Sequence, residues 1–188
     1  DEEFGRFFNN LINGGLETTR NTLAFAMQEL IAHPEQYRRL QADPSLVPNA
    51  VEETLRHRNT VVYLRRTATR DMEFAGQQIR RGDKLVCVLG APNRDPAYFE
   101  RPDEFDIGRS PEATRRNYRT FGFGPHHCLG LGQARMNLTV MIGEVARRIH
   151  NPRLAGEPQH ARSIFADGFK RLPIAFDPQP LEAGTPGR

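Results

Sequence analysis

Apolar side chains recur at intervals of three or four residues through two long stretches of the chain. In residues 4–32 the series consists of Phe7, Phe8, Leu11, Ile12, Leu16, Leu23, Phe25, Ala26 and Leu30. Such spacing is typical of one face of a helix. We expect this helix to end at His33-Pro34, because the residue before a proline avoids the helical conformation. Residues 131–150 predict a second long helix, and residues 35–42 and 50–57 predict shorter ones.

Strand-forming residues and turn signals occupy the middle and the end of the chain. Residues 61–64 are rich in strand formers, and residues 74–79 have the composition of a hairpin. Residues 85–89 form a short apolar run that fits either a strand or the start of a helix. Residues 172–176 predict an edge strand.

Two other segments lack a clear periodicity. Proline, glycine, aspartate and arginine dominate residues 93–119, so we expect a long ordered loop, and a loop of that length is usually functional or anchored. The tail from Asn151 is expected to be irregular apart from the edge strand, with residues 179–188 disordered. The chain has no initiating Met and opens with Asp-Glu-Glu-Phe inside a helical pattern, so we expect a fragment of a longer protein.

Composition excludes several classes of protein. The 188 residues are 38% hydrophobic and 26% charged, which is ordinary for a globular domain. Two cysteines exclude a disulfide-rich secreted scaffold. The net charge of +3 comes without a zinc-finger spacing or a long basic run, so nucleic-acid binding is not expected. No apolar run has the length of a membrane span and no signal peptide is visible, so we expect a soluble, cytoplasmic protein without membrane association.

The first long helix contains Asn13-Gly14-Gly15. Glycine in a helix interior costs about 1 kcal/mol relative to alanine, so Gly14 and Gly15 need a reason. One interpretation is close packing against another helix. The other is a widened turn where a ligand approaches the backbone, and the residues alone do not decide between them.

The second long helix follows a glycine-rich loop, residues 121–130, that contains Cys128. A glycine-rich backbone and a helix N-terminus both stabilise a thiolate, which is the form of cysteine that binds iron. One alternative is a buried, inert cysteine. Another is a zinc site made by His126, His127 and Cys128, although three consecutive residues rarely converge on one tetrahedral metal.

The spacing Phe-x-x-Gly-x-His-x-Cys-x-Gly resembles the haem-binding signature of cytochromes P450. It is met here by Phe121, Gly124, His126, Cys128 and Gly130. An Ala-Arg pair, Ala134 and Arg135, also follows as in that family. The resemblance implies a mainly α fold with small β-sheets, of which residues 1–178 form the C-terminal, haem-binding part from the central oxygen-binding helix onward. It implies haem b as the cofactor, with Cys128 as the iron ligand and Phe121, Gly122 and Gly130 beside it.

Glu53 and Arg56 resemble the Glu-x-x-Arg motif of the same family. Their i, i+3 spacing on a helix lets the two side chains meet. Alone, such a pair is usually an exposed salt bridge of little energetic worth. The resemblance implies that here the pair is buried and is joined by Arg109 from the long loop.

Residues 14–19 resemble the oxygen-binding groove of the family's central helix, which gives the two glycines a functional interpretation. Glu17 and Thr18 match the family's acid–alcohol pair, in which a hydroxyl holds water and a carboxylate delivers protons. Alternatively, Glu17 is a solvated helix residue and Thr18 bonds back to its own helix. Arg66 matches a haem-propionate ligand, with Arg65 as the alternative register, and His126 is expected to bind a propionate too.

The resemblance implies a haem-thiolate monooxygenase that inserts one atom of dioxygen into a lipophilic substrate. Electrons are expected from a ferredoxin and its reductase, with the ferredoxin docking on Arg115, Arg116, Arg119 and Arg135. The substrate pocket is expected to include Val61, Val62 and Phe165 with Gly14 and Gly15. The alternatives are a non-oxygenase haem-thiolate protein (an isomerase, a peroxygenase or a sensor), an inactive fragment, and a domain without haem in which Cys128 is merely buried.

Overall fold

The computed structural model describes residues 1–178, and the expected disordered tail, residues 179–188, lies outside them. Within that range the α-helices are α1 (Glu2–Ala32), α2 (Pro34–Ala42), α3 (Val47–His57), α4 (Pro111–Asn117) and α5 (Leu131–Arg148). Three single 3₁₀ turns are η1 (Pro44–Leu46), η2 (Pro92–Arg94) and η3 (Gly124–His126).

The strands of the described chain pair in twos, and every pair is antiparallel. The pairs are β1 (Tyr63–Thr67) with β4 (Lys84–Val88), β2 (Met72–Phe74) with β3 (Gln77–Ile79), β5 (Ile149–Leu154) with β8 (Ile174–Pro178), and β6 (Gln159–His160) with β7 (Phe169–Arg171). The predicted mainly α fold with small sheets is therefore confirmed.

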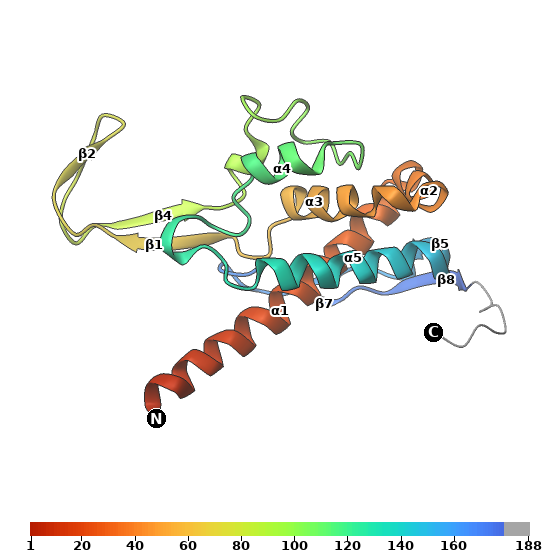
Figure 1. The fold of residues 1–188 in the computed structure, drawn as a ribbon, viewed down its shortest axis with the longest axis horizontal. Helices are drawn as coiled ribbons and strands as arrows, with labels where there is room; N and C mark the ends of the chain where they lie inside the picture. Colours follow the sequence, from red (N-terminus) through yellow and green to blue (C-terminus); the bar gives the residue numbers. More distant parts are fainter. Residues whose placement is uncertain (179–188) are drawn as a thin grey trace.

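The core lies where the second half of α1 crosses α2, α3 and α5. Its buried apolar residues include Ala26, Leu30, Leu40, Val51, Leu55, Leu138 and Ile142. Two arms leave this body on the same side, namely the first half of α1 and the β2–β3 hairpin (Figure 1). The α1 arm leaves large apolar side chains in solvent, among them Phe4, Phe7, Phe8, Leu11, Ile12 and Leu16.

Local sequence accounts for the ends and turns of these elements. The carboxylate of Asp1 accepts a hydrogen bond from the N–H of Glu3 and so caps α1. The hairpin turns at Ala75 and Gly76, which both adopt positive φ, as a tight two-residue turn requires. Glycine takes this conformation without strain, whereas Ala75 does so at a cost.

Three predicted elements differ from the structure. The strand expected over residues 61–64 begins at Tyr63, because Val61 pairs with Ala166 of the C-terminal region instead. The expected loop 93–119 contains α4, capped by the Ser110 hydroxyl. The second long helix ends at Arg148, and the tail expected to be irregular forms β5, whose bulge allows pairing with β8. In the described part of the chain, no helix has the length and apolar character that crossing a membrane requires.

Candidate functional site

The loop before α5 presents the thiol of Cys128 to solvent. The N–H of Cys128 donates to the carbonyl of Phe121 at 3.0 Å, which closes the loop into a compact turn. Gly122 and Gly124 take φ values of 72° and 70°, a left-handed conformation that favours glycine. The interpretation of Cys128 as a buried, inert residue is therefore wrong.

The helix α5 begins shortly after this cysteine. The first intrahelical bond of α5 runs from the N–H of Ala134 to the carbonyl of Gly130. The N–H groups of the first turn have no partner inside the helix, and they form the positive end of its dipole. Cys128 lies three residues before Leu131, where α5 begins, and so precedes the positive end of this helix.

Arg66 of β1 lies on the face of its strand that is turned toward this loop. The Cδ1 atom of Leu64 lies 3.7 Å from the position that a Cβ would take on Gly122. Side chains two residues apart share a face of a strand, so Arg66 follows Leu64 toward the loop and Arg65 points the other way. Arg66 and His126 are both exposed. The alternation thus places Arg66, and not Arg65, on the strand face that Leu64 turns toward the loop.

The glycines of α1 border open space. Outside their own helical turns, no atom of the described chain lies within 4 Å of a Cβ placed on Gly14 or Gly15. Close packing within this chain therefore gives no reason for them. The Thr18 hydroxyl donates to the carbonyl of Gly14 at 2.5 Å, so it bonds back to its own helix, as the alternative interpretation expects. Glu17 is exposed.

The residues expected to line a substrate pocket lie together beside α1. The N–H of Val62 donates to the carbonyl of Phe165 at 2.9 Å, and the rings of Tyr63 and Phe165 meet edge to face. A pair of hydroxyls, Thr22 and Thr60, lies 3.1 Å apart and joins this segment to α1 one turn beyond Thr18. Sequence reasoning missed both threonines, because nothing in their local pattern distinguishes them from other helix and loop threonines.

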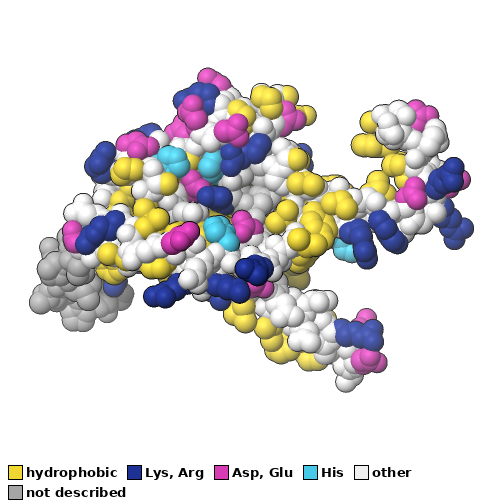
Figure 2. Space-filling model, turned by 180° about the vertical axis from the view of Figure 1, so that it is seen from behind, with side chains coloured by type: hydrophobic (Ala, Val, Ile, Leu, Met, Phe, Trp, Pro, Cys, Tyr) yellow, Lys and Arg dark blue, Asp and Glu magenta, His cyan; other side chains and the backbone are white. Residues whose placement is uncertain are grey.

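These residues fit a haem. The loop offers a single exposed thiol, and no group of three His, Cys, Asp or Glu side chains suited to a metal ion occurs in residues 1–178. Large apolar side chains stand exposed on three nearby segments, as in Leu16, Leu129 and Ile164. Hydrophobic side chains also gather at the base of the two arms and along the α1 arm (Figure 2). An apolar macrocycle with anionic arms matches one cysteine sulfur, apolar faces and the cationic side chain of Arg66.

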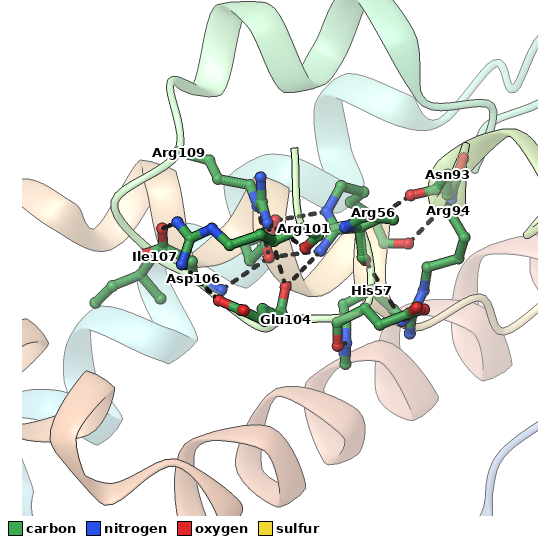
Figure 3. Close-up of polar contacts among 12 residues, drawn as sticks. Arg56, His57, Asn93, Arg94, Arg101, Glu104, Asp106, Ile107 and Arg109 are labelled. Atoms are coloured by element: carbon green, nitrogen blue, oxygen red, sulfur yellow. Dashed lines mark hydrogen bonds and ion pairs between the residues drawn. The ribbon is translucent and has the colours of Figure 1, made fainter. Parts of the chain in front are cut away.

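Arg56 is buried at the centre of a polar network (Figure 3). It forms two hydrogen bonds of 2.7 Å with the Glu53 carboxylate. The other N–H groups of the guanidinium donate to the carbonyls of Asn93, Pro102 and Glu104. All five of its donors are thus satisfied.

Arg109 completes this network from the long loop, as the family resemblance implies. Its Nε donates to Glu53 at 3.3 Å, and its other nitrogens donate to the carbonyls of Glu100 and Arg101. The network therefore fastens the long loop to α3 (Figure 3). The same helix holds the start of the cysteine loop, because the Thr120 hydroxyl donates to the carbonyl of Leu55 at 2.6 Å.

A second buried carboxylate on α3, Glu52, went unnoticed in the sequence. Arg115 of α4 and Arg135 of α5 each donate to Glu52 at 2.8 Å, and the Tyr118 hydroxyl donates at 2.6 Å. Burial, followed by the charge of Glu52, raises the pKa of Tyr118. Of the four arginines expected to form a ferredoxin-docking face, Arg115 and Arg135 are therefore hydrogen-bonded to the buried Glu52 carboxylate. Arg119 also turns inward, toward the carbonyls of Arg116 and Tyr118.

A third carboxylate, Glu29, holds the end of α1 against α3. Its oxygens lie 3.3 Å from Nδ1 of His57, 2.5 Å from Nε of Arg58 and 3.5 Å from Nδ1 of His33. Burial by itself raises the pKa of Glu29. The hydrogen bond and charge of His57, together with those of Arg58, outweigh burial and lower this pKa to about 2. The carboxylate is thus held in its charged form.

Comparison with known proteins gives consistent matches. The family model for cytochrome P450 matches residues 1–150. The chain is 38% identical over 174 residues to a protein of Mycobacterium tuberculosis named putative cytochrome P450 126. It is 45% identical over 139 residues to the 20-oxo-5-O-mycaminosyltylactone 23-monooxygenase of Streptomyces fradiae. These alignments cover 93% and 74% of this chain, but 41% and 32% of the two relatives.

A solved structure agrees with these matches. The crystal structure of CYP108D1 from Novosphingobium aromaticivorans DSM12444 resembles this chain with a TM-score of 0.84 and 36% sequence identity. The match covers 92% of this chain and 41% of that one. The chain thus spans less than half the length of each protein to which it is similar here.

Proposed function

The chain belongs to the cytochrome P450 family, and from that premise we propose that it is the haem-binding portion of a haem-thiolate monooxygenase with Cys128 as the iron ligand. The observation that carries this proposal is the exposed thiol of Cys128. It lies at the positive end of α5, in a loop closed by its own N–H bond to Phe121.

In this proposal the side chains around the loop hold haem b. Cys128 ligates the iron, and Arg66 and His126 pair with the propionates. Phe121 covers the sulfur side, while Gly122 and Gly130 let the backbone approach the flat ring. The Glu53–Arg56–Arg109 network has a structural role, since it holds the loop that precedes this site. When bound, the haem supplies reductive activation of dioxygen, which thiolate ligation favours.

Glu17 and Thr18 on α1 would deliver protons to the site. Thr18 has an acceptor in Gly14 at 2.5 Å, so its hydroxyl is oriented while its oxygen can still accept a bond from a water molecule. Glu17 is exposed, and its carboxylate can exchange protons with solvent and pass them inward.

The substrate class follows from the lining residues. Val61, Val62 and Phe165 are apolar, and the backbone bond between Val62 and Phe165 fixes their edge of the pocket beside α1. Together with the open space over Gly14 and Gly15, this lining suits a lipophilic compound.

Electrons come from an acidic ferredoxin, itself reduced by a ferredoxin reductase. The docking face is narrower than the sequence suggests, because Arg135 is largely covered and bonded to Glu52. Arg116, which is exposed, and the exposed part of Arg115 remain to attract an acidic partner on the cysteine side.

The decisive experiment is turnover of the haem-loaded protein with ferredoxin, reductase and a lipophilic substrate under isotopically labelled dioxygen. One labelled oxygen atom per product molecule supports a monooxygenase. Product without label, or product formed without NAD(P)H, contradicts a monooxygenase. Such a result points to an isomerase or a peroxygenase.

The roles of Glu17 and Thr18 are tested in the same assay. Thr18→Ala and Glu17→Gln should each lower the ratio of product formed to NAD(P)H consumed by about tenfold. Losses of this order or larger are usual when a proton-transfer group is removed. Thr19→Ala is the matched control, because Thr19 is the next residue on the same helix and is turned to another side. Equal effects of Thr18→Ala and Thr19→Ala would contradict a specific role.

A further inference from the structure

The carboxylate of Glu52 is the centre of a buried cluster that the roles above do not use. The side chain is 1% exposed. Its Oε1 accepts from Nε of Arg115 and from Nε of Arg135, and its Oε2 accepts from the Tyr118 hydroxyl. Nη2 of Arg135 also donates to the Tyr118 oxygen at 2.7 Å. Glu52, Tyr118 and Arg135 thus form a closed ring of charge-assisted hydrogen bonds, which are the strong kind.

This ring bears directly on the cysteine loop. The guanidinium of Arg135 lies over the ring of Phe121, 4.9 Å from its centroid. The ring of Tyr118 lies 6.2 Å from that of Phe121 on a tilted plane. The carbonyl of Phe121, in turn, accepts the N–H of Cys128 at 3.0 Å. A continuous series of contacts therefore runs from Glu52 to the backbone of the thiol residue.

We propose that Glu52, Tyr118 and Arg135 are positioning residues that hold Phe121 in place and thereby keep the backbone of Cys128 bonded to the carbonyl of Phe121. This inference rests on the proposed function of Cys128 as a haem ligand. If Phe121 is free to move, the hydrogen bond from the N–H of Cys128 to its carbonyl opens and the loop no longer holds the sulfur in one position.

A purely structural role for the ring is the competing explanation. If the ion pair only stabilises the fold, removing one of its bonds lowers the stability of the whole protein. If it positions the cysteine loop, the same removal disturbs the loop even where overall stability changes little. Removal of Glu52 does not separate the two, because it leaves Arg135 without a charge partner and endangers folding. Tyr118→Phe is milder, since it removes one hydroxyl and keeps the ring that contacts Phe121.

A second buried tyrosine provides a matched control. Tyr37 is 3% exposed and Tyr118 is 5% exposed. The Tyr37 hydroxyl donates to the carbonyl of Ile149 at 2.7 Å, just past the C-terminal end of α5 and far along the helix from the cysteine loop. The same hydroxyl also lies 3.0 Å from the carbonyl of Val145, so Tyr37→Phe removes one buried hydroxyl and its bonds at the other end of the same helix.

The readout is the rate at which the reduced, CO-bound haem protein loses its thiolate-type absorption band. Tyr118→Phe should raise this rate about tenfold, which corresponds to roughly 1.4 kcal/mol. Arg135→Lys should act in the same direction, because lysine keeps the charge but loses the planar contact with Phe121. Tyr37→Phe should leave the rate within about twofold of the original, even where it lowers the unfolding temperature.

Each outcome decides something specific. An unchanged rate of band loss in Tyr118→Phe and Arg135→Lys, or equal acceleration by Tyr37→Phe, would overturn the positioning role and leave the Glu52 cluster as a structural feature. A thiolate-type spectrum absent from the unsubstituted protein would instead overturn the proposed function, whatever the variants do.

Discussion

Glu53 and Arg56 are joined by two hydrogen bonds of 2.7 Å at a place where neither side chain reaches solvent. The guanidinium also binds three carbonyl groups of the loop that leads to the cysteine segment. An i, i+3 pair of this kind is usually a minor surface feature. Here burial makes each partner dependent on the other, and the pair connects α3 to the segment before the candidate site.

Arg56→Ala should therefore prevent haem incorporation. It leaves Glu53 buried without its main partner, which costs about 3–5 kcal/mol, and it frees three carbonyl groups of the loop. Haem content per polypeptide and the free energy of unfolding measure the two effects.

The exposed pair formed by Glu144 and Arg147 is the matched control, since it has the same spacing and a contact of 2.7 Å. Arg147→Ala should change the free energy of unfolding by no more than about 1 kcal/mol and leave haem content intact. Normal haem content in Arg56→Ala would refute the anchoring role.

Acid should weaken the junction between α1 and α3. The folded protein holds the pKa of Glu29 at about 2, compared with an ordinary value of 4.5. Because this pKa is lowered on folding, the contribution of Glu29 is fully present above about pH 4.5 and is lost as the pH falls toward 2. At 1.36 kcal/mol per pKa unit the loss amounts to about 3 kcal/mol.

Urea unfolding from about pH 6 down to about pH 3 measures this effect. Glu29→Gln should be less stable than the original protein near neutrality and should lose less stability on acidification. The exposed Glu157→Gln should keep the original pH dependence. A parallel fall in both variants would show that Glu29 is not the group that titrates.

Gly14→Ala should separate stability from ligand binding. A Cβ at this position meets no neighbour in the described chain, and alanine is the better helix former by about 1 kcal/mol. The variant should therefore be at least as stable as the original, but the added methyl group narrows the space proposed for dioxygen. CO affinity of the reduced protein measures that narrowing.

Gly5→Ala in the same helix is the control, because its Cβ also meets nothing and it lies two turns before the groove. It should leave CO affinity unchanged. Equal CO affinities for Gly14→Ala and Gly5→Ala would argue against a cofactor next to Gly14.

Reduction by an acidic ferredoxin should slow as salt rises, because attraction between exposed charges is screened within about 10 Å at 0.1 M ionic strength. Arg116→Ala should reduce the rate at low salt and flatten the salt dependence. Arg38→Ala, which removes the same charge from the distant α2, should do neither. Salt-independent reduction of the original protein would contradict the docking face.

Much of this architecture was accessible from the sequence. The period of apolar residues and His33-Pro34 predicted α1 to within two residues at its start and correctly at its end. The cysteine loop was accessible for a different reason, because its glycines serve a backbone geometry that few other residues allow. The sequence did not predict α4, although Ser110-Pro111-Glu112 is a recognisable helix start. The prolines and glycines around it indicate a loop.

The role of Glu52 was not accessible in the same way. Two adjacent glutamates on a helix normally mean a solvated face. Here arginines of α4 and α5 meet Glu52, whereas Arg56 and the long loop, through Arg109, meet Glu53. The arginines that meet Glu52 come from distant parts of the chain, and the sequence interpretation expected them in a basic docking face. Likewise, the bond between Val62 and Phe165 spans about a hundred residues and depends on tertiary structure alone.

The thiolate assignment itself is tested most directly by the absorption spectrum of the reduced, CO-bound protein with each cysteine replaced in turn. The chain contains two cysteines, and Cys87 on β4 is the natural control. The original protein and Cys87→Ser should both give a thiolate-type band, and Cys128→Ser should not. A thiolate-type band that survives in Cys128→Ser, or the absence of any haem band from the original protein, would contradict the assignment.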